Sequence, residues 1–573
     1  MKGTVHYEKR DDVALLSIDN PPVNPLSSGV RQGLFDGVTQ ALEDDAITSI
    51  VITGMHRAFI AGADISEFGA AASKGVGLHD VLKVMENSSK PIVAAINHTA
   101  FGGGLETALC CNYRIAAPLA PVGLPEVKLG LLPGAGGTQR LPRLAGAEAA
   151  LNAMVSGDPI LAPEALELGI IDKIADSDLV EEAIVWAREI VAAGGELRRV
   201  RDIDDRIAQD RGNDEMFARA AAKIEQRQRN MNAPARILKC VEMSINTHDF
   251  DAGLAFEAEQ FKECLNDPQR EALIHIFFAE RAANKIPGLD KDLPLVEVNK
   301  GSVVGAGLMG GGIAMCFANA GIPVRVHDND LENLTKGIGV IEANYARTVS
   351  RGRLSQEEMD KRMSLIIPTE NFEDLVDADV VIEAVYENLD LKKEIFARLD
   401  KIMPQGTLLA TNTSALDVDA IAASTSRPAD VCGMHFFSPA NVMRLLEVVR
   451  AEKSAPVTIA SALALGKRIG KVSVVAGNCP GFIGNRMIHG YSHQASQMIL
   501  EGAKPAHVDK VMYDFGLAMG PFTMLDMVGL DLGWRARKMV GGSNDVIVRV
   551  PDELCELGRY GQKTGKGFYR YEE

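Results

Sequence analysis

The stretch Val303-Val-Gly-Ala-Gly-Leu-Met-Gly-Gly-Gly312 decides the fold of the middle of this chain. Two valines end an apolar run, and three glycines follow at the spacing Gly-x-Gly-x-x-Gly. In such a turn the first glycine permits a tight bend, the second lets backbone approach a pyrophosphate, and the third lets the next helix pack closely. We therefore predict a strand, a turn and a helix whose N-terminal amides face a dinucleotide. The expected contact residues are Gly305, Gly307, Leu308, Met309 and Gly310.

An acid follows the next predicted strand at the distance that a nucleotide site requires. The strand Pro323-Val-Arg-Val-His-Asp328 ends 21 residues after Gly307. A carboxylate there accepts hydrogen bonds from the ribose hydroxyls of NAD and repels the extra phosphate of NADP. A glycine-rich turn alone also occurs in unrelated α/β domains, but strand, turn, helix, strand and acid in this order favour an NAD domain. Asp328 is the predicted ribose contact, and Asp330 is the next candidate.

Composition excludes several classes of protein. The chain has 573 residues, of which 46% are hydrophobic and 24% charged, as in ordinary globular proteins of several domains. Its net charge of −17 offers no basic surface to nucleic acid or an anionic membrane. It has no apolar run long enough for a membrane span, and its opening lacks the apolar core of a signal peptide. Eight cysteines without a Cys-x-x-Cys pair predict reduced thiols, no metal site and a cytosol-like compartment.

The pattern of the chain changes several times along its length. Short apolar strands at Val13–Ile18, Ser49–Thr53 and Ile92–Ile96 alternate with helical sequence, which is an α/β pattern. Charged, helix-periodic sequence follows, and then a segment rich in proline and glycine. The predicted divisions are 1–190 (α/β), 191–285 (helical connector), 286–295 (linker), 296–477 (nucleotide domain) and 478–573 (all-helical).

Two acids of the first part lie in apolar surroundings. Glu106 ends His98-Thr-Ala-Phe-Gly-Gly-Gly-Leu-Glu106, and Glu126 follows 20 residues later in Leu124-Pro-Glu126. Buried acids are usually paired, capping or catalytic, and spacing alone leaves open whether Glu106 only caps a helix. Upstream, Phe59-Ile-Ala-Gly-Ala-Asp-Ile65 is a second glycine turn. Amides of two such turns, when they converge, form an oxyanion hole for a thioester carbonyl.

A histidine and a carboxylate follow the nucleotide segment. Val431-Cys-Gly-Met-His435 is predicted to end a strand, and Met443-Arg-Leu-Leu-Glu447 to open the next. A lone histidine at a strand end is commonly structural. After a nucleotide domain it also fits the base that removes a hydroxyl proton during hydride transfer. A partner carboxylate would fix its tautomer and stabilise the imidazolium.

These motifs together resemble two known families. The stretches Phe59–Ile65, Gly102–Glu106 and Gly123–Leu141 resemble the enoyl-CoA hydratase (crotonase) family, and the central segment resembles 3-hydroxyacyl-CoA dehydrogenase. Their fusion in this order, with Phe278–Lys285 leading into the linker, resembles the bifunctional fatty-acid β-oxidation enzymes over essentially the whole chain. The implied fold is an α/β multidomain chain: a spiral ββα crotonase domain, a helical connector, a Rossmann-type NAD domain and an all-helical C-terminal dehydrogenase domain.

The resemblance implies two activities and their residues. Glu106 would activate a water and Glu126 would supply the α-carbon proton, so that trans-2-enoyl-CoA becomes (S)-3-hydroxyacyl-CoA. The implied oxyanion hole consists of the amides of Ala63 and Gly103. His435 and Glu447 would then oxidise the alcohol to 3-oxoacyl-CoA with NAD. The implied further contacts are Ser414, Ser438 and Asn485 for the substrate and Glu383 for the cofactor. Monofunctional dehydrogenases have asparagine where this chain has Ser438.

Other interpretations stay open at this point. The first half could work mainly as a Δ3-Δ2-enoyl-CoA isomerase, since one glutamate and the same oxyanion hole suffice. Alternatively, one half could be a binding module that only holds CoA esters, although the four acids and bases above argue against it.

The partners and the compartment are also expectations. Multifunctional relatives usually continue into a second, degenerate helical copy that this sequence lacks. With the apolar residues crowded between Met512 and Val528, this predicts a homodimer through 478–573. The resemblance further suggests a thiolase partner. The C-terminal Arg-Tyr-Glu-Glu is not a peroxisomal address, which favours the cytoplasm.

Overall fold

The computed structural model of the chain divides into two compact units, Met1–Phe277 and Phe278–Glu573, and each is described by itself. The structure describes residues 3–64, 67, 75–283, 285–290, 292–539, 541–543 and 545–572. Ile65, at the end of the second glycine turn, and Lys291, in the expected linker, lie outside these residues. The described residues of 286–295 form no helix or strand, as a linker requires.

The first unit is built on two mostly parallel sheets. A six-stranded sheet has the order β1-β2-β3-β5-β7-β10, and a four-stranded sheet has the order β4-β6-β8-β9. From β3 to β8 successive strands alternate between the two sheets, and a helix or helical turn follows each pair, which confirms the predicted spiral of ββα repeats. The strand bounds are β1 Thr4–Arg10, β2 Val13–Asp19, β3 Ser49–Gly54, β4 Ala58–Ile60, β5 Ile92–Ile96, β6 Thr99–Phe101, β7 Tyr113–Ala116, β8 Pro121–Gly123, β9 Ile160–Leu161 and β10 Lys173–Ile174. The three strands predicted from sequence are β2, β3 and β5.

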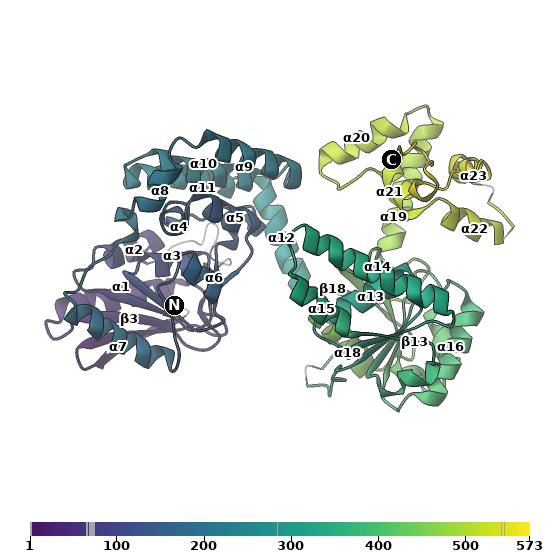
Figure 1. Cartoon of the computed structure of the whole chain (residues 1–573), viewed down its shortest axis with the longest axis horizontal. Helices are drawn as coiled ribbons and strands as arrows, with labels where there is room; N and C mark the ends of the chain where they lie inside the picture. The colour runs from purple at the N-terminus through teal and green to yellow at the C-terminus, as the bar shows by residue number, and fades with distance from the viewer. Residues whose placement is uncertain are drawn as a thin grey trace. The chain divides into compact units, whose positions relative to one another are not determined.

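Helices cover both faces of the larger sheet. Side chains of β3 and β5 are buried throughout, as expected for parallel strands with helices on both faces. The α7 helix packs against one face, whereas α1, α2 and α3 belong to the core on the other (Figure 1). The helix bounds are α1 Ser28–Glu43, α2 Leu78–Glu86, α3 Gly103–Cys110, η2 Pro125–Leu129, α4 Gly137–Ala145, α5 Ala147–Ser156, α6 Ala162–Glu167, α7 Leu179–Ala192 and η3 Val200–Asp202.

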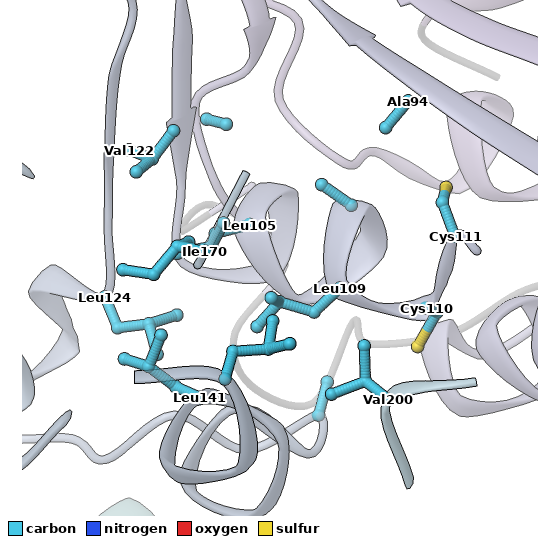
Figure 2. Close-up of a cluster of buried hydrophobic side chains, with 14 of the residues drawn as sticks. Ala94, Leu105, Leu109, Cys110, Cys111, Val122, Leu124, Leu141, Ile170 and Val200 are labelled. Atoms are coloured by element: carbon cyan, nitrogen blue, oxygen red, sulfur yellow. The ribbon is translucent and has the colours of Figure 1, made fainter. Parts of the chain in front are cut away.

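The predicted connector is helical, and all of its helices but the last lie entirely within the first unit, which ends at Phe277 inside that last helix. Their bounds are α8 Asp205–Asp210, α9 Asp214–Arg227, α10 Asn232–Asn246, α11 Phe250–Leu265 and α12 Pro268–Ala282. The α10 helix contacts both α4 and α5, and α11 contacts α4 (Figure 1). Ile237, Cys240 and Val241 of α10 join the same core as α3 and α4. Figure 2 shows part of this core, where Leu105 and Leu109 of α3 lie near Leu141 of α4.

The second unit contains an eight-stranded sheet with the order β13-β12-β11-β14-β15-β16-β17-β18. The first six strands have the Rossmann order 3-2-1-4-5-6, and β16–β17 is the antiparallel pair. The strand bounds are β11 Gly301–Val304, β12 Val324–His327, β13 Ile366–Thr369, β14 Val380–Glu383, β15 Leu408–Thr411, β16 Val431–Phe436, β17 Leu445–Arg450 and β18 Val472–Gly477. Because strand order reverses between β11 and β14, a ligand crevice is expected at their carboxyl ends.

Helices cover both faces of this sheet too. Side chains of α13, α14 and α18 share a core with one face, and those of α16 and α17 share a core with the other. The helix bounds are α13 Leu308–Asn319, α14 Leu331–Ser350, α15 Gln356–Ser364, η4 Phe372–Asp377, α16 Leu389–Ile402, α17 Val418–Ala422, η5 Pro428–Asp430 and α18 Pro456–Arg468.

The remainder of the second unit is helical, as predicted. Its bounds are α19 Gly484–Leu500, α20 Pro505–Phe515, α21 Pro521–Val528, α22 Asp531–Met539, η6 Val546–Val548, α23 Arg549–Glu556 and η7 Gln562–Thr564. Two buried acids join these elements. Asp526 of α21 accepts hydrogen bonds from the amides of Phe568 and Tyr569, and Asp509 of α20 accepts one from the amide of Phe522. No helix of the described residues is long and apolar enough to cross a membrane.

Candidate active sites

A cavity of about 330 Å³ lies in the first unit. All four residues predicted for the hydratase chemistry line it, together with Phe261 from the connector helix α11. The predicted residues are Ala63, Gly103, Glu106 and Glu126. The connector therefore contributes directly to the wall of the site.

Close backbone packing sets the position of the two amides. A Cβ atom added to Gly104 would lie 2.2 Å from the carbonyl oxygen of Ile60, so only glycine lets α3 approach this strand. A Cβ atom on Gly103 would lie 4.0 Å from the amide nitrogen of Ala63, which places the two turns side by side. Gly103 is the first residue of α3, and a first-turn amide has no acceptor within its own helix. Both amides can therefore be directed at one oxygen in the cavity.

The Glu106 carboxylate is held by a segment remote in sequence. Its Oε1 accepts hydrogen bonds from the amides of Ala135 (2.7 Å) and Gly137 (2.8 Å), and the residue is 3% exposed. Although Glu106 lies in the first turn of α3, these bonds occupy it outside that helix, so it does not serve as a simple cap. Burial raises the pKa of Glu106, and the two amides and the charge of Arg140 oppose that rise.

Glu126 lies on η2 in a different environment. Its Oε2 atom is buried and has no hydrogen-bond partner among the described residues. Burial raises the pKa of Glu126 well above its ordinary value, and the neighbouring charges of Glu106 and Glu257 add to the rise. Glu126 is therefore the acid of the pair that more readily keeps a proton, and Glu106 the one more easily ionised.

A third buried carboxylate, that of Glu257, lies close enough to interact electrostatically with Glu106 and Glu126, and the sequence did not predict it. Glu257 of α11 accepts hydrogen bonds from the amides of Gly136 and Thr138, in the same turn that holds Glu106. Glu257 lies on the buried face of α11, together with Phe250 and Gly253. An acid on an otherwise apolar helix face is the sequence signal that could have predicted a buried carboxylate here.

The glycine turn of the second unit has the geometry that the fingerprint predicts. Gly305 has φ +107°, and its amide donates to the carbonyl of His327 at 2.7 Å. A Cβ atom on Gly310 would lie 1.8 Å from the oxygen of Gly305, so close packing requires the third glycine. No described atom lies within 4 Å of the corresponding position on Gly307. The turn is therefore open at the residue expected to face the pyrophosphate, and it fits NAD.

Asp328 follows β12 beside this turn. Its Oδ2 accepts a hydrogen bond from the amide of Ala306 (3.0 Å), and its Oδ1 accepts one from the amide of Asp330 (3.1 Å). Asp330 instead caps α14, because its carboxylate accepts from the amides of Glu332 and Asn333. Of the two candidate acids, Asp328 is the one at the nucleotide turn.

His435 and Glu447 are direct cross-strand partners. They face each other in the antiparallel pair of β16 and β17, with 2.7 Å between Nδ1 and Oε2. The other carboxylate oxygen of Glu447 accepts hydrogen bonds from the amides of Ile483 (3.0 Å) and Gly484 (2.8 Å) at the start of α19. Burial opposes ionisation, but the bonds from His435 and these amides outweigh it and hold the pKa of Glu447 below its ordinary value. An ionised Glu447 orients the ring so that Nε2 is the atom available for proton transfer.

The predicted contact of Glu383 with the cofactor needs correction. Glu383 is 0% exposed, and its carboxylate is occupied by Lys392 Nζ (2.7 Å), the Thr411 hydroxyl and the Val385 amide. A saturated, enclosed carboxylate has no face left for a ligand. Glu387, four residues further on, is partly exposed and accepts hydrogen bonds from the amide (2.9 Å) and hydroxyl (3.2 Å) of Ser414.

The remaining predicted contacts lie near the histidine in sequence or structure. Ser438 is exposed and lies just after β16, and Asn485 is the second residue of α19, beside the amides that hold Glu447. Phe437 and Phe482 pack against the His435 ring, with ring centroids 4.6 Å and 5.6 Å away.

Comparison with known proteins agrees with this geometry. Residues 8–233 match the family model described as enoyl-CoA hydratase/isomerase. Residues 300–479 and 481–571 match the NAD binding and C-terminal domains of 3-hydroxyacyl-CoA dehydrogenase. The chain is 43% identical to the peroxisomal bifunctional enzyme of Homo sapiens, over 98% of this chain and 79% of that protein. It is 38% identical to the peroxisomal fatty acid β-oxidation multifunctional protein of Arabidopsis thaliana, over 98% and 79%.

The chain belongs to the family of multifunctional fatty-acid β-oxidation enzymes. It combines an enoyl-CoA hydratase with an NAD-dependent 3-hydroxyacyl-CoA dehydrogenase that act on acyl-CoA thioesters. The matched relatives do not favour the interpretation of the first half as mainly an isomerase, although its family model includes isomerases. The domain boundaries at 190, 285 and 477 stay a prediction, as do the roles of single residues.

Proposed function

We propose that Glu106 and Glu126 together hydrate trans-2-enoyl-CoA in the cavity of the first unit. The observation that carries this proposal is that both acids line one cavity with the amides of Ala63 and Gly103. The different anchoring of the two acids supports different roles. Glu106 is held by two amides and is the more easily ionised, whereas the raised pKa of Glu126 favours its protonated form.

The hydration consists of two proton transfers and the formation of one carbon–oxygen bond. Glu106 accepts a proton from a water whose oxygen forms a bond to C3 of the enoyl chain. Electrons of the double bond move toward the thioester carbonyl, whose oxygen accepts hydrogen bonds from the amides of Ala63 and Gly103. Glu126 delivers its proton to C2, and the product is (S)-3-hydroxyacyl-CoA. Glu106 then releases its proton to solvent and Glu126 takes one up, which restores both acids for the next turnover. Each positioned acid or base of this kind contributes about 10²–10⁴-fold to the rate.

In the second unit, His435 serves as the base for the oxidation of the alcohol. NAD supplies the hydride acceptor when it is bound. His435 takes the hydroxyl proton at Nε2, and Glu447 stabilises the imidazolium through the 2.7 Å hydrogen bond. Ser438 and Asn485 bind the substrate in this proposal. The dinucleotide is held by Gly305, Gly307, Leu308, Met309, Gly310 and Asp328.

We further propose that Glu387, rather than Glu383, shapes the nicotinamide side of the site through Ser414. Its carboxylate is partly exposed and already orients the Ser414 hydroxyl. Lys392 lies 3.5 Å from this carboxylate and lowers its pKa, against the effect of burial, so Glu387 stays ionised. Glu387→Gln is expected to raise the KM for NAD or substrate about tenfold. The same change at Glu383 should instead lower stability.

A single assay tests the combined function. Purified protein with crotonyl-CoA and NAD should produce NADH, since hydration must precede oxidation. No NADH from crotonyl-CoA, together with NADH from added (S)-3-hydroxybutyryl-CoA, would remove the hydratase proposal alone.

We propose a homodimer through the helical residues 478–573. Large apolar side chains there are exposed, with Phe515 at 79% and Met487 at 71%. An exposed apolar set of this size commonly marks an interface. Further exposed residues of this set are Ile483, Met498, Leu500, Val511, Met527 and Val528. Light scattering on the eluting peak should give twice the chain mass of 61.5 kDa, and a fully active monomer would contradict the proposal.

A thiolase is the proposed further partner, because the 3-oxoacyl-CoA product is the thioester that thiolases cleave. Co-elution of the two purified proteins tests this. For the compartment we keep the cytoplasm as the proposal, whereas the names of the matched relatives favour peroxisomes. Microscopy of the tagged chain in its own cells separates the two.

A further inference from the structure

The feature that the proposed mechanism does not use is Glu257, a third carboxylate behind the hydratase cavity. It is 1% exposed and lies on the buried face of α11, on the same side as Phe250, Gly253 and Cys264. An isolated buried acid costs several kcal/mol, so a helix that only covered the site would carry an apolar residue here. The role inferred below rests on the proposed function of Glu106.

Glu257 and Glu106 hold alternate amides of one short turn, which consists of residues 135–138. The amides of Ala135 and Gly137 donate to Glu106 at 2.7 and 2.8 Å. The intervening amides of Gly136 and Thr138 donate to Glu257 at 2.6 and 3.0 Å, and the Thr138 hydroxyl donates to it as well. The two carboxylates therefore accept hydrogen bonds from alternate amides of the same turn, so a change in the backbone of this turn affects the donors of both.

The turn itself has little freedom apart from these bonds. Gly136 has φ +94°, and a Cβ atom there would lie 1.8 Å from Arg140 Nη1. Arg140 in turn donates to the carbonyl of Ala135 at 3.1 Å and pairs with Glu86 at 2.9 Å. Phe261, one helical turn after Glu257, lines the cavity, so α11 touches both the site and the turn behind it.

We propose that Glu257 is a positioning residue for hydration, which fixes the turn 135–138 and through it the Glu106 carboxylate. Glu257 is not among the described residues that line the cavity, so it acts through the turn and not on the substrate. Its loss would free the amides of Gly136 and Thr138 to turn, and the donors to Glu106 would turn with them. A catalytic group displaced by about 1 Å can lose 10²-fold in rate while substrate binding is kept.

Charge provides a readout that a purely structural role would not affect. The charged or titratable groups near Glu257 are Glu106 of α3, Glu126 of η2, Arg140 of α4 and Cys240 of α10. Burial, with the charge of Glu106 next, raises the pKa of Glu257 to about 8. Its negative charge also raises the pKa of Glu126. Removal of that charge should therefore lower the pKa of Glu126 and move the alkaline limit of hydration to lower pH.

The first variant is Glu257→Gln, which keeps the volume, removes the charge that Glu257 carries above its pKa of about 8, and leaves one of the two amides without its acceptor. We expect the hydration kcat to fall about 10- to 100-fold with KM nearly unchanged. The alkaline limit should move by about half a pH unit to lower pH. Oxidation of added 3-hydroxyacyl-CoA should stay at the wild-type rate, which reports that the chain is folded.

Glu182→Gln is the matched control. Glu182 of α7 also accepts hydrogen bonds from two backbone amides, those of Asp176 and Ser177, and from the Ser177 hydroxyl. None of these residues lines the cavity. Its hydration kcat and pH profile should equal those of the wild type.

A second pair of variants keeps the test decisive if Glu257→Gln does not fold. Thr138→Val removes the hydroxyl bond to Glu257 together with the bond that Gln139 Nε2 donates to this hydroxyl (2.8 Å), and Thr138→Ser restores the hydroxyl for both. Valine should lower kcat about three- to tenfold with an unchanged KM, and serine should recover most of the loss.

The outcomes separate this inference from the proposed function. Wild-type kcat and pH profile in Glu257→Gln, or equal kcat in the valine and serine variants, would overturn the positioning role. An equal loss in Glu182→Gln would also overturn it, because the effect would then be general destabilisation. If Glu106→Gln itself hydrated normally, the two-carboxylate proposal would fail first.

Discussion

The two active sites use the same residue type in opposite electrostatic states. In the first unit, burial raises the pKa of Glu106 and Glu126, and a buried oxygen of Glu126 accepts no hydrogen bond from the part of the chain that the structure describes. In the second unit, burial also acts to raise the pKa of Glu447, but the bonds from His435 and two amides outweigh it and hold that pKa below the ordinary value. The partners of a buried carboxylate, more than burial itself, decide whether it carries a proton. Hydration needs an acid that can give a proton to carbon, whereas the dehydrogenase needs a permanent anion beside its base.

The sites also share one structural device. Glu106 and Glu447 each accept hydrogen bonds from two backbone amides of a segment that lies far along the chain. The segment is 135–137 for Glu106 and 483–484 for Glu447. In both cases the amides come from residues within two positions of the start of a helix, α4 or α19, where backbone amides have no acceptor within the helix. The difference is that Glu447 has a histidine partner as well, and that partner determines its charge.

The largest expected effect is a loss of hydration in the first unit that leaves the dehydrogenase of the second unit unchanged. Glu106→Gln or Glu126→Gln should lower hydration about 10³-fold, because one of the two proton transfers loses its group. Oxidation of added 3-hydroxyacyl-CoA should be unchanged. Hydration is followed by the loss of enoyl absorbance, and a rate within about tenfold of the wild type would remove the two-carboxylate mechanism.

A comparable loss should be confined to the second site by His435→Ala. The hydroxyl proton then has no base, and hydride transfer should fall about 10²–10⁴-fold while the Kd for NAD changes little. Single-turnover NADH formation and titration calorimetry with NAD measure the two quantities. Substantial loss of NAD binding would show instead that the histidine is structural.

A smaller effect is expected at the ribose contact. Asp328→Ala should weaken NAD binding about tenfold and reduce the preference for NAD over NADP, since the carboxylate both accepts ribose hydroxyls and repels a 2′-phosphate. The kcat/KM ratio for the two cofactors measures this preference. Asp330→Ala serves as the control, because its carboxylate caps α14. An unchanged preference in the Asp328 variant would show that the acid is misassigned.

The smallest effect tests the electrostatic contrast through stability. Because the pKa of Glu126 is raised on folding, its ionisation costs stability at neutral pH, and this cost disappears as pH falls below the ordinary value of 4.5. Glu126→Gln should therefore stabilise the first unit at pH 7 by about 1–3 kcal/mol. The lowered pKa of Glu447 has the opposite sign. Its contribution is fully present above pH 4.5 and is lost as pH falls through the lower folded value.

Glu447→Gln should accordingly destabilise the second unit by about 1–3 kcal/mol at pH 7, with the difference shrinking in acid. Scanning calorimetry at pH 7 and pH 4 measures both variants. Shifts of the same sign in the two units would contradict the contrast between them.

Local sequence predicted the parts of this molecule whose chemistry is local. The glycine turn around Gly305 is a short-range steric requirement, and the predicted strands β2, β3 and β5 are continuous apolar runs. His435 and Glu447 were expected on neighbouring strands, and their register pairs them directly. Each of these features depends on residues close together in the chain or on two adjacent strands.

The features that sequence did not predict depend on contacts across long separations. Glu257 accepts hydrogen bonds from the amides of Gly136 and Thr138, which lie about 120 residues earlier in the chain. The local sequence around Glu257 offers one signal of this role, an acid on the apolar face of a helix. Glu383 was assigned to the cofactor as an acid at a strand end, but Lys392, on the next helix, encloses it. The connector was predicted to pack on something, and only the fold shows that it forms a wall of the hydratase cavity.

The central claim is that two independent active sites act in sequence on one thioester, and complementation in trans tests it most directly. Glu106→Gln keeps the dehydrogenase and His435→Ala keeps the hydratase, so neither variant alone should form NADH from crotonyl-CoA and NAD. An equimolar mixture should form it, because released 3-hydroxyacyl-CoA passes from one protein to the other. NADH from either variant alone, or none from the mixture, would contradict the account.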